Sequence, residues 1–242
     1  MLDHLACLHD EVARFQAAIG DLDTPVPACP DWRVRDLVHH VGSVHRRFRR
    51  VAEEGWMRRP PRLDPDDRPA PSDDRITAWA EREAERLLVA LASLDPAAPR
   101  WNFTTGPQVG AFIPRRMLHE TTIHRWDLED ATGAAGPIRE EVAIDGVHEY
   151  LEVLLLRSGD WHGDPAVVRT SLRGGPRLDL MLRPGEQASV QVDGDPTAPP
   201  DAILEAAPVE MLLAWWGRRP LTTLLTSGDD ELITEVRRFA RT

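Results

Sequence analysis

The apolar residues of segment 34–51 recur in alternating steps of three and four. They are Val34, Leu37, Val41, Val44, Phe48 and Val51. This spacing follows the 3.6-residue period of an α-helix and gives one continuous apolar stripe. Because a helix with such a stripe has to bury it against other helices, the pattern predicts the seam of a helical bundle.

Other segments share this helical character as far as residue 157. The further helices expected in this part of the chain cover residues 2–19, 73–93, 111–132 and 139–157. They are separated by segments rich in Pro, Asp and Gly, and the longest of these is a crossover over residues 57–72. We therefore predict an all-helical bundle in a domain of residues 1–160.

The pattern changes after residue 160. Short runs with strand character surround Gly174-Gly175-Pro176, which favours a hairpin. The expected strands are 166–172, 177–182 and 189–192, and the expected helices are 209–216 and 229–241. Residues 161–242 are therefore predicted to form a small α/β domain with a short sheet.

Two polar residues interrupt the apolar stripe of segment 111–132. The stripe consists of Ile113, Met117, Glu120, His124 and Leu128. Glu120 and His124 are four residues apart, so their side chains lie on one side of the helix. A buried carboxylate without a partner is costly, so Glu120 requires a cation, a donor network or a metal. His40, beside the stripe of segment 34–51, is placed to add a third ligand from a second helix.

These three residues allow two interpretations. Two imidazoles and one carboxylate leave a coordination position open, which is typical of a catalytic metal site. Zinc is the first choice, and iron, nickel or manganese suit the same ligands. The alternative is a simple ion pair of Glu120 with His124. The segment is no HExxH protease motif, because its second histidine comes one residue late. Asp36, one turn before His40, could orient that ring or lie exposed on its helix.

Composition excludes several classes of function. The net charge of -11 argues against nucleic-acid binding. The chain has no lysine, so a Schiff-base lysine, a lysine base and a Walker-A loop are all excluded. Its apolar runs are too short to span a membrane, and two cysteines are too few for a disulfide framework. We therefore expect a cytoplasmic protein with reduced thiols.

One basic run stands out against this acidic background. Residues 45–50 read His-Arg-Arg-Phe-Arg-Arg beside Glu53 and Glu54. A solvated helix face is the expected interpretation, with His39 and His45 at the surface. A cradle for an anionic substrate is the alternative.

Two longer motifs identify a family resemblance. Residues 29–41 read CPDWRVRDLVHHV, and residues 116–129 read RMLHETTIHRWDLE. They resemble the signatures C-x-x-W-x-V-x-D-L-x-x-H and R-x-x-x-E-x-x-x-H-R-W-D-x-E of the mycothiol-dependent maleylpyruvate isomerase family, within the DinB/YfiT-like metalloenzymes. The later run LLAWWGRRPL, at residues 212–221, resembles the end of that family's second domain.

The resemblance implies a fold, a cofactor and a cosubstrate. It implies a DinB-like four-helix bundle followed by a C-terminal α/β domain, with zinc bound by His40, Glu120 and His124. It also implies mycothiol, a low-molecular-weight thiol, as cosubstrate. A metal-bound thiol is deprotonated, and its thiolate can add to an activated double bond. If the thiolate leaves again the protein is a cis-trans isomerase, and if it stays attached the protein is an S-transferase.

Two further hypotheses stay open. One is a thiol-independent, metal-dependent hydrolase on the same scaffold, and the other is a non-catalytic metal- or ligand-binding module. The expected partners are the thiol and a small electrophile, without nucleic acid or membrane, in a monomer or a homodimer.

An anionic electrophile would require arginine, since lysine is absent. The candidates for this role are Arg116, Arg125, Arg218 and Arg219, with a surface role as the alternative for each. The second-domain pair depends on that domain covering the mouth of the bundle. Trp32 and Trp126 flank the motifs and are candidates for the wall of the thiol site, with a place in the core as the alternative.

Overall fold

A computed structural model describes residues 2–61, 69–104, 106–155, 159–194 and 199–240 of the chain. The chain forms two compact units, Met1–Pro137 and Ile138–Thr242. The boundary between them precedes the expected one at residue 160. Of the expected crossover 57–72, residues 62–68 lie outside the described part of the chain. None of the helices in the described ranges combines the length and apolar character that crossing a bilayer requires.

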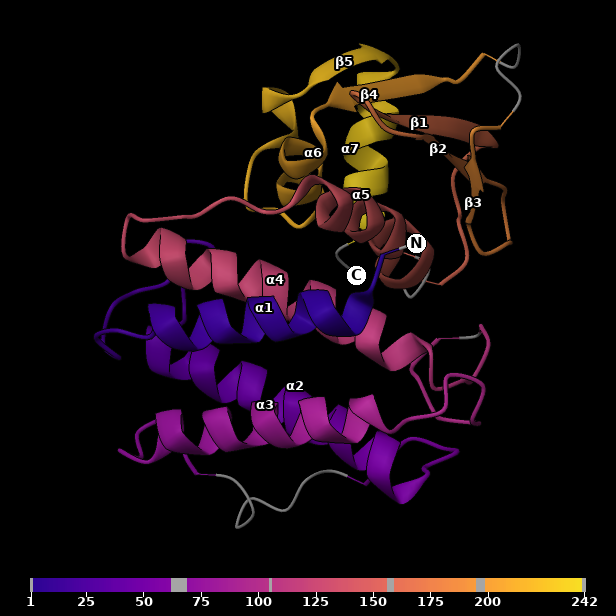
Figure 1. The fold of residues 1–242 in the computed structure, drawn as a ribbon. Coiled ribbons are helices and arrows are strands. Elements are labelled where there is room, and N and C mark those ends of the chain that lie inside the picture. The colour runs from indigo at the N-terminus through magenta and orange to yellow at the C-terminus, as the bar shows by residue number, and fades with distance from the viewer. Residues whose placement is uncertain (1, 62–68, 105, 156–158, 195–198, 241–242) are drawn as a thin grey trace. The chain divides into compact units, whose positions relative to one another are not determined.

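The first unit is a helical bundle, as predicted. Its described residues form four α-helices (Figure 1), namely α1 (His4–Ala18), α2 (Val34–Glu54), α3 (Ile76–Ala92) and α4 (Phe112–Ala131). Helix α2 packs mainly against α3, and α1 packs mainly against α4. The apolar stripe of α2 enters the core through Val34, Leu37 and Val41, which share one core cluster with Ile76 and Trp79 of α3. The stripe that predicted a bundle seam therefore forms one.

Local interactions fix where these helices begin and end. The side chain of Asp3 accepts a hydrogen bond from the Ala6 N–H and caps α1. At the start of α2, Asp36 accepts the backbone N–H of Arg33 at 2.9 Å. Gly55 ends α2 in the left-handed conformation, with φ of 69°. Asp36 thus acts at the helix start, in place of the suggested role of orienting His40.

The second unit begins with a helix that was expected to belong to the first. Helix α5 (Glu140–Glu149) continues as a π-helix, Tyr150–Leu154, and packs against α6 (Pro208–Trp215). This packing explains why the boundary of the units precedes α5. Helix α7 (Asp230–Phe239) completes the unit. The last two residues of the helix expected at 139–157 lie outside the described part, since residues 156–158 are not described.

Helices α5, α6 and α7 lie on one side of a mixed sheet (Figure 1). In the described residues the strand order is β3-β2-β1-β4-β5. Strands β1 (Ala166–Leu172), β2 (Arg177–Leu182) and β3 (Ser189–Val192) form an antiparallel meander at the predicted positions. Strand β4 (Ala202–Ala206) is parallel to β1, and β5 (Leu225–Gly228) is antiparallel to β4. The α/β prediction is confirmed.

Strands β4 and β5 were not predicted, for different reasons. Strand β4 reads Ala-Ile-Leu-Glu-Ala, and alanine and glutamate have low strand propensity. Its alternating burial arises from its place between β1 and β5. Strand β5 is a four-residue edge strand whose residues are all exposed, so its sequence carries no apolar alternation.

Candidate metal centre

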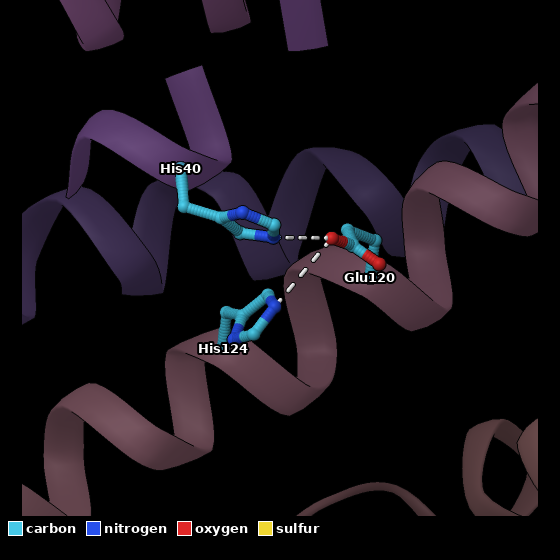
Figure 2. A group of neighbouring side chains, drawn as sticks. All are labelled: His40, Glu120 and His124. Atoms are coloured by element: carbon cyan, nitrogen blue, oxygen red, sulfur yellow. Dashed lines mark hydrogen bonds and ion pairs between the residues drawn. The ribbon is translucent and has the colours of Figure 1, made fainter. Parts of the chain in front are cut away.

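Three side chains from two helices of the first unit converge (Figure 2). His40 comes from α2, and Glu120 and His124 come from consecutive turns of α4. The Glu120 Oε1 atom lies 2.9 Å from His40 Nε2 and 3.5 Å from His124 Nε2. One ligand atom from each residue lies within 4.8 Å of the other two. The three residues that the sequence proposed as ligands therefore lie together in the structure.

Glu120 is held as a carboxylate at the centre of this group. Burial by itself would raise its pKa, but hydrogen bonds to His124 and His40 and the charge of Arg116 outweigh that effect and leave the pKa well below its usual value. Arg116 donates to the Glu120 Oε2 atom at 2.7 Å. This contact leaves Oε1 as the oxygen that faces both imidazoles.

The ring of His124 is oriented from its other side. Its Nδ1 atom lies 2.9 Å from Oδ2 of Asp127, whose side chain is fully buried. Burial would lower the pKa of His124, but the hydrogen bonds to Asp127 and Glu120 outweigh this and raise it. An acceptor at Nδ1 directs Nε2 toward the triad, as is usual for metal-bound histidines. Sequence reasoning missed Asp127, although the i,i+3 spacing from His124 was a usable signal.

The two candidate tryptophans have different surroundings. The Trp32 ring lies 5.0 Å from the His40 ring and 6.4 Å from the His124 ring, measured between centroids. Trp32 therefore lies against both imidazoles of the triad. Trp126 is buried on α4, two residues after His124. Residues two apart on a helix point in nearly opposite directions, so Trp126 belongs to the core and does not lie against these imidazoles.

The two arginines of α4 are engaged by carboxylates. Arg116 is buried against Glu120. Arg125 is fully buried and bonds Glu11 of α1 at 2.8 Å and Glu129 at 2.7 Å. The structure therefore gives Arg125 a structural role, joining α1 to α4, in place of the predicted substrate clamp.

The arginine pair of the second unit has surroundings of its own. The Arg218 guanidinium lies 5.6 Å from the Trp216 ring centroid and donates to the Trp216 carbonyl oxygen, and Arg219 is exposed.

The basic run 45–50 is only partly a solvated face. Arg47 is exposed, but His45 and Arg49 are buried, with 2% and 5% of their surface accessible. Arg49 is paired with Glu83 of α3 at 3.0 Å, which leaves no open anion cradle at this residue. Burial lowers the pKa of His45 to about 4, an effect that the nearby Glu120 carboxylate opposes. The expectation of a surface histidine at position 45 was wrong. The apolar stripe of a helix does not show which residues beside the stripe are covered by other helices.

The donor set of the triad fits a divalent transition metal. It offers two imidazole nitrogens and one carboxylate oxygen from facing helices, with further polar groups orienting Glu120 and His124. The side chains are 34%, 13% and 8% exposed for His40, Glu120 and His124, so within this unit the site is reachable from the His40 side. Such a set could bind a cation and leave room for an exogenous ligand.

Comparisons with known proteins identify the family of the chain. Residues 5–129 match the family model of the mycothiol maleylpyruvate isomerase (MDMPI) N-terminal domain. Residues 141–235 match the family model of the MDMPI C-terminal domain. No curated protein has a significantly similar sequence.

Solved structures share the fold. A crystal structure of a mycothiol-dependent maleylpyruvate isomerase aligns with a TM-score of 0.64 at 14% identity, covering 93% of this chain and 92% of that one. A histidine-to-alanine mutant of such an enzyme aligns with a TM-score of 0.62 at 12% identity and the same coverage. At these identities the likeness establishes the fold alone.

Proposed function

Because the chain belongs to the mycothiol maleylpyruvate isomerase family, we propose that it is a metal-dependent enzyme that activates mycothiol for addition to a small electrophile. The observation that carries this proposal is the triad of His40, Glu120 and His124, whose ligand atoms lie within 4.8 Å of one another. The family favours cis-trans isomerisation of a maleylpyruvate-like substrate. An S-transferase would use the same thiol addition without the final release of the thiol.

The metal and the protein have separate tasks in this proposal. A divalent transition metal, with zinc as the first choice, would lower the pKa of a bound thiol and so supply a thiolate at neutral pH. Glu120 stays anionic with its Oε2 atom engaged by Arg116, and Asp127 fixes the His124 ring. The Trp32 ring lies beside the two imidazoles, 5.0 Å from that of His40 and 6.4 Å from that of His124 between centroids.

Binding of the electrophile requires other groups. Arg116 and Arg125 are engaged by buried carboxylates, so neither offers an uncommitted guanidinium. Arg218 and Arg219 therefore stay the predicted binding residues for an anionic electrophile. We expect the enzyme to act in the cytoplasm, as a monomer or a homodimer. In the described structure Cys7 and Cys29 form no disulfide.

Elemental analysis of the purified chain tests the metal. We expect about one metal ion per chain in the wild type, and its loss in Glu120→Ala and His124→Ala, because each substitution removes one ligand of the open three-ligand site. Glu85→Ala, which replaces an exposed glutamate of α3, is the matched control and should keep the metal. A folded wild type without metal after reconstitution would contradict the proposal.

The reaction is tested with the metal-loaded protein and mycothiol. Isomerisation of maleylpyruvate that depends on catalytic amounts of thiol identifies an isomerase. A stable thioether product, detected by mass spectrometry with one thiol consumed per turnover, identifies an S-transferase. Turnover at the same rate without thiol would reject both.

A further inference from the structure

A buried hydrogen bond joins α2 to α4 beside the candidate metal centre. His45 Nε2 of α2 lies 2.9 Å from the Thr121 Oγ1 atom of α4. His45 is 2% exposed and Thr121 is completely buried. This contact is separate from the triad, since neither residue offers a ligand atom to it. Thr121 nevertheless directly follows Glu120, and His45 is five residues after His40 on the same helix.

The two helices that carry the ligands are each packed mainly against another partner. Helix α2 lies chiefly on α3, and α4 lies chiefly on α1. A metal bound by His40, Glu120 and His124 would nevertheless require α2 and α4 to keep a fixed separation and axial shift. The His45–Thr121 hydrogen bond crosses this less extensive helix contact within about one turn of Glu120. It is therefore placed to set the position of His40 relative to the other two ligands.

The placement of an imidazole here is unfavourable unless it has a specific role. His45 Nδ1 is buried and has no hydrogen-bond partner among the described residues. His45 also lines a small cavity with Val12, Phe15 and Val41, which an aliphatic side chain would suit. Since a buried polar atom without a partner destabilises the fold, the gain from histidine at this position lies in its other nitrogen, which bonds Thr121.

The charge of His45 is also suited to this place. Burial keeps its pKa at about 4, so the ring is neutral at neutral pH. A lysine or arginine at this position would put a permanent positive charge close to a site that binds a cation. A neutral imidazole ties the two helices together without that repulsion.

We infer that His45 and Thr121 are positioning residues, which hold His40 of α2 at the distance from Glu120 and His124 of α4 that one metal ion requires. This inference rests on the proposed function, because it presupposes a metal at the triad. Partners outside the ligand set commonly change metal affinity by about ten- to a hundredfold.

Matched substitutions in the full-length protein test the inference. Thr121→Val removes the hydroxyl and keeps the shape, whereas Thr121→Ser keeps the hydroxyl. Thr122→Val is the control, because Thr122 is equally buried but its Oγ1 atom has no partner among the described residues. Zinc affinity is measured by competition with a chromophoric chelator, and ligand geometry by the visible spectrum of the Co²⁺-loaded protein.

We expect Thr121→Val to weaken zinc binding about tenfold and to change the cobalt spectrum, as partners outside the ligand set do. Thr121→Ser and Thr122→Val should match the wild type. His45→Leu should behave like Thr121→Val, and the double variant should be no worse than either single one, since all three lack the same bond. His45→Gln, which can still donate to Thr121, should recover part of the affinity.

Two results would overturn the inference and leave the proposed function intact. In the first, the wild type binds zinc, and the Thr121→Val variant has the same zinc affinity and the same cobalt spectrum as the wild type. In the second, the Thr121→Val variant unfolds at a lower urea concentration than the wild type but has the same zinc affinity. That result would show that the His45–Thr121 hydrogen bond stabilises the fold without positioning the ligands. A folded wild type that binds neither metal would reject the proposed function and the positioning role together.

Discussion

At the residue scale, the second polar atom of two of the three candidate ligands, Glu120 and His124, contacts a residue outside the triad. Glu120 presents Oε1 to both imidazoles while Arg116 engages Oε2, and His124 presents Nε2 while Asp127 engages Nδ1. These contacts fix the orientation of two ligands before a metal arrives. The sequence motif contained both outer residues but did not reveal which atoms they would contact.

Asp127→Asn should weaken metal binding about ten- to a hundredfold. The substitution keeps the size of the side chain but removes the charge that favours a donor at His124 Nδ1. Chelator competition measures the affinity. Asp130→Asn, one turn further along α4, is the control and should bind as the wild type does. An unchanged affinity for Asp127→Asn would show that His124 needs no charged acceptor at Nδ1.

His45 should make the stability of the metal-free protein depend on pH. Its pKa is about 4 in the folded state, against 6.5 for an unperturbed histidine. Between these values the unfolded chain binds a proton that the folded chain does not, so stability is complete above pH 6.5 and falls as the pH drops toward 4. The loss attributable to His45 is on the order of 3 kcal/mol over the whole window.

Urea unfolding at pH 7.5 and pH 5 measures this effect. In His45→Gln the fall in unfolding free energy between the two pH values should be smaller than in the wild type by about 2 kcal/mol. His9→Gln, which replaces an exposed histidine of α1, controls for the substitution itself. An equal fall in wild type and His45→Gln would mean that His45 titrates normally in the folded protein.

At the scale of elements, buried ion pairs connect helices of the bundle. Arg125 of α4 bonds Glu11 of α1 and Glu129 of its own helix, and it also donates to the carbonyl oxygens of Gly136 and Pro137. The two side chains of the ion pair that joins α1 to α4 are buried, with exposures of 0% for Arg125 and 3% for Glu11. Such pairs add little when intact, but removing one member leaves a buried charge without a partner.

Arg125→Met should lower the unfolding free energy by about 3–5 kcal/mol, because the buried Glu11 keeps only the longer pair with Arg14, at 3.7 Å. Adding Glu11→Gln to this variant should restore part of the loss. Arg50→Met, which breaks the exposed pair with Glu54, should change stability by less than about 1 kcal/mol. Urea unfolding compares all four proteins, and a stable Arg125→Met variant would contradict the structural role of Arg125.

The elements themselves were predictable where one sequence pattern sufficed. The apolar stripes predicted α2 and α4, and the runs around Gly174-Gly175 predicted β1 and β2 at their observed residues. Strand β4 could not be found in this way, because its alanines are suited to a strand only after β1 and β5 flank it.

At the scale of the whole molecule, the three candidate ligands belong to one of two compact units. His40, Glu120 and His124 all lie in Met1–Pro137, which has its own apolar core around Leu37, Val41 and Trp79. The second unit, Ile138–Thr242, contains the sheet and the Arg218–Arg219 pair. The ligand atoms of the triad therefore require no residue after Pro137.

A fragment of residues 1–137 should fold and bind metal, since an autonomous core is the property that defines a domain. We expect a helical circular dichroism spectrum, a cooperative melting transition and a zinc affinity within about tenfold of the full chain, since all outer partners of the ligands are present. The same fragment carrying Glu120→Ala is the control. A folded fragment with much weaker binding would show that the second unit supports the site.

The sequence by itself determined the periodic elements, the family and the three candidate ligands, because helical spacing and short motifs are local properties of the chain. Tertiary structure decided which candidate arginines were already engaged, that Trp32 and not Trp126 lies against the imidazoles, and that His45 is buried. It also decided that α5 packs with α6 in the second unit. These outcomes depend on which residues of distant segments become neighbours, and no local pattern contains that information.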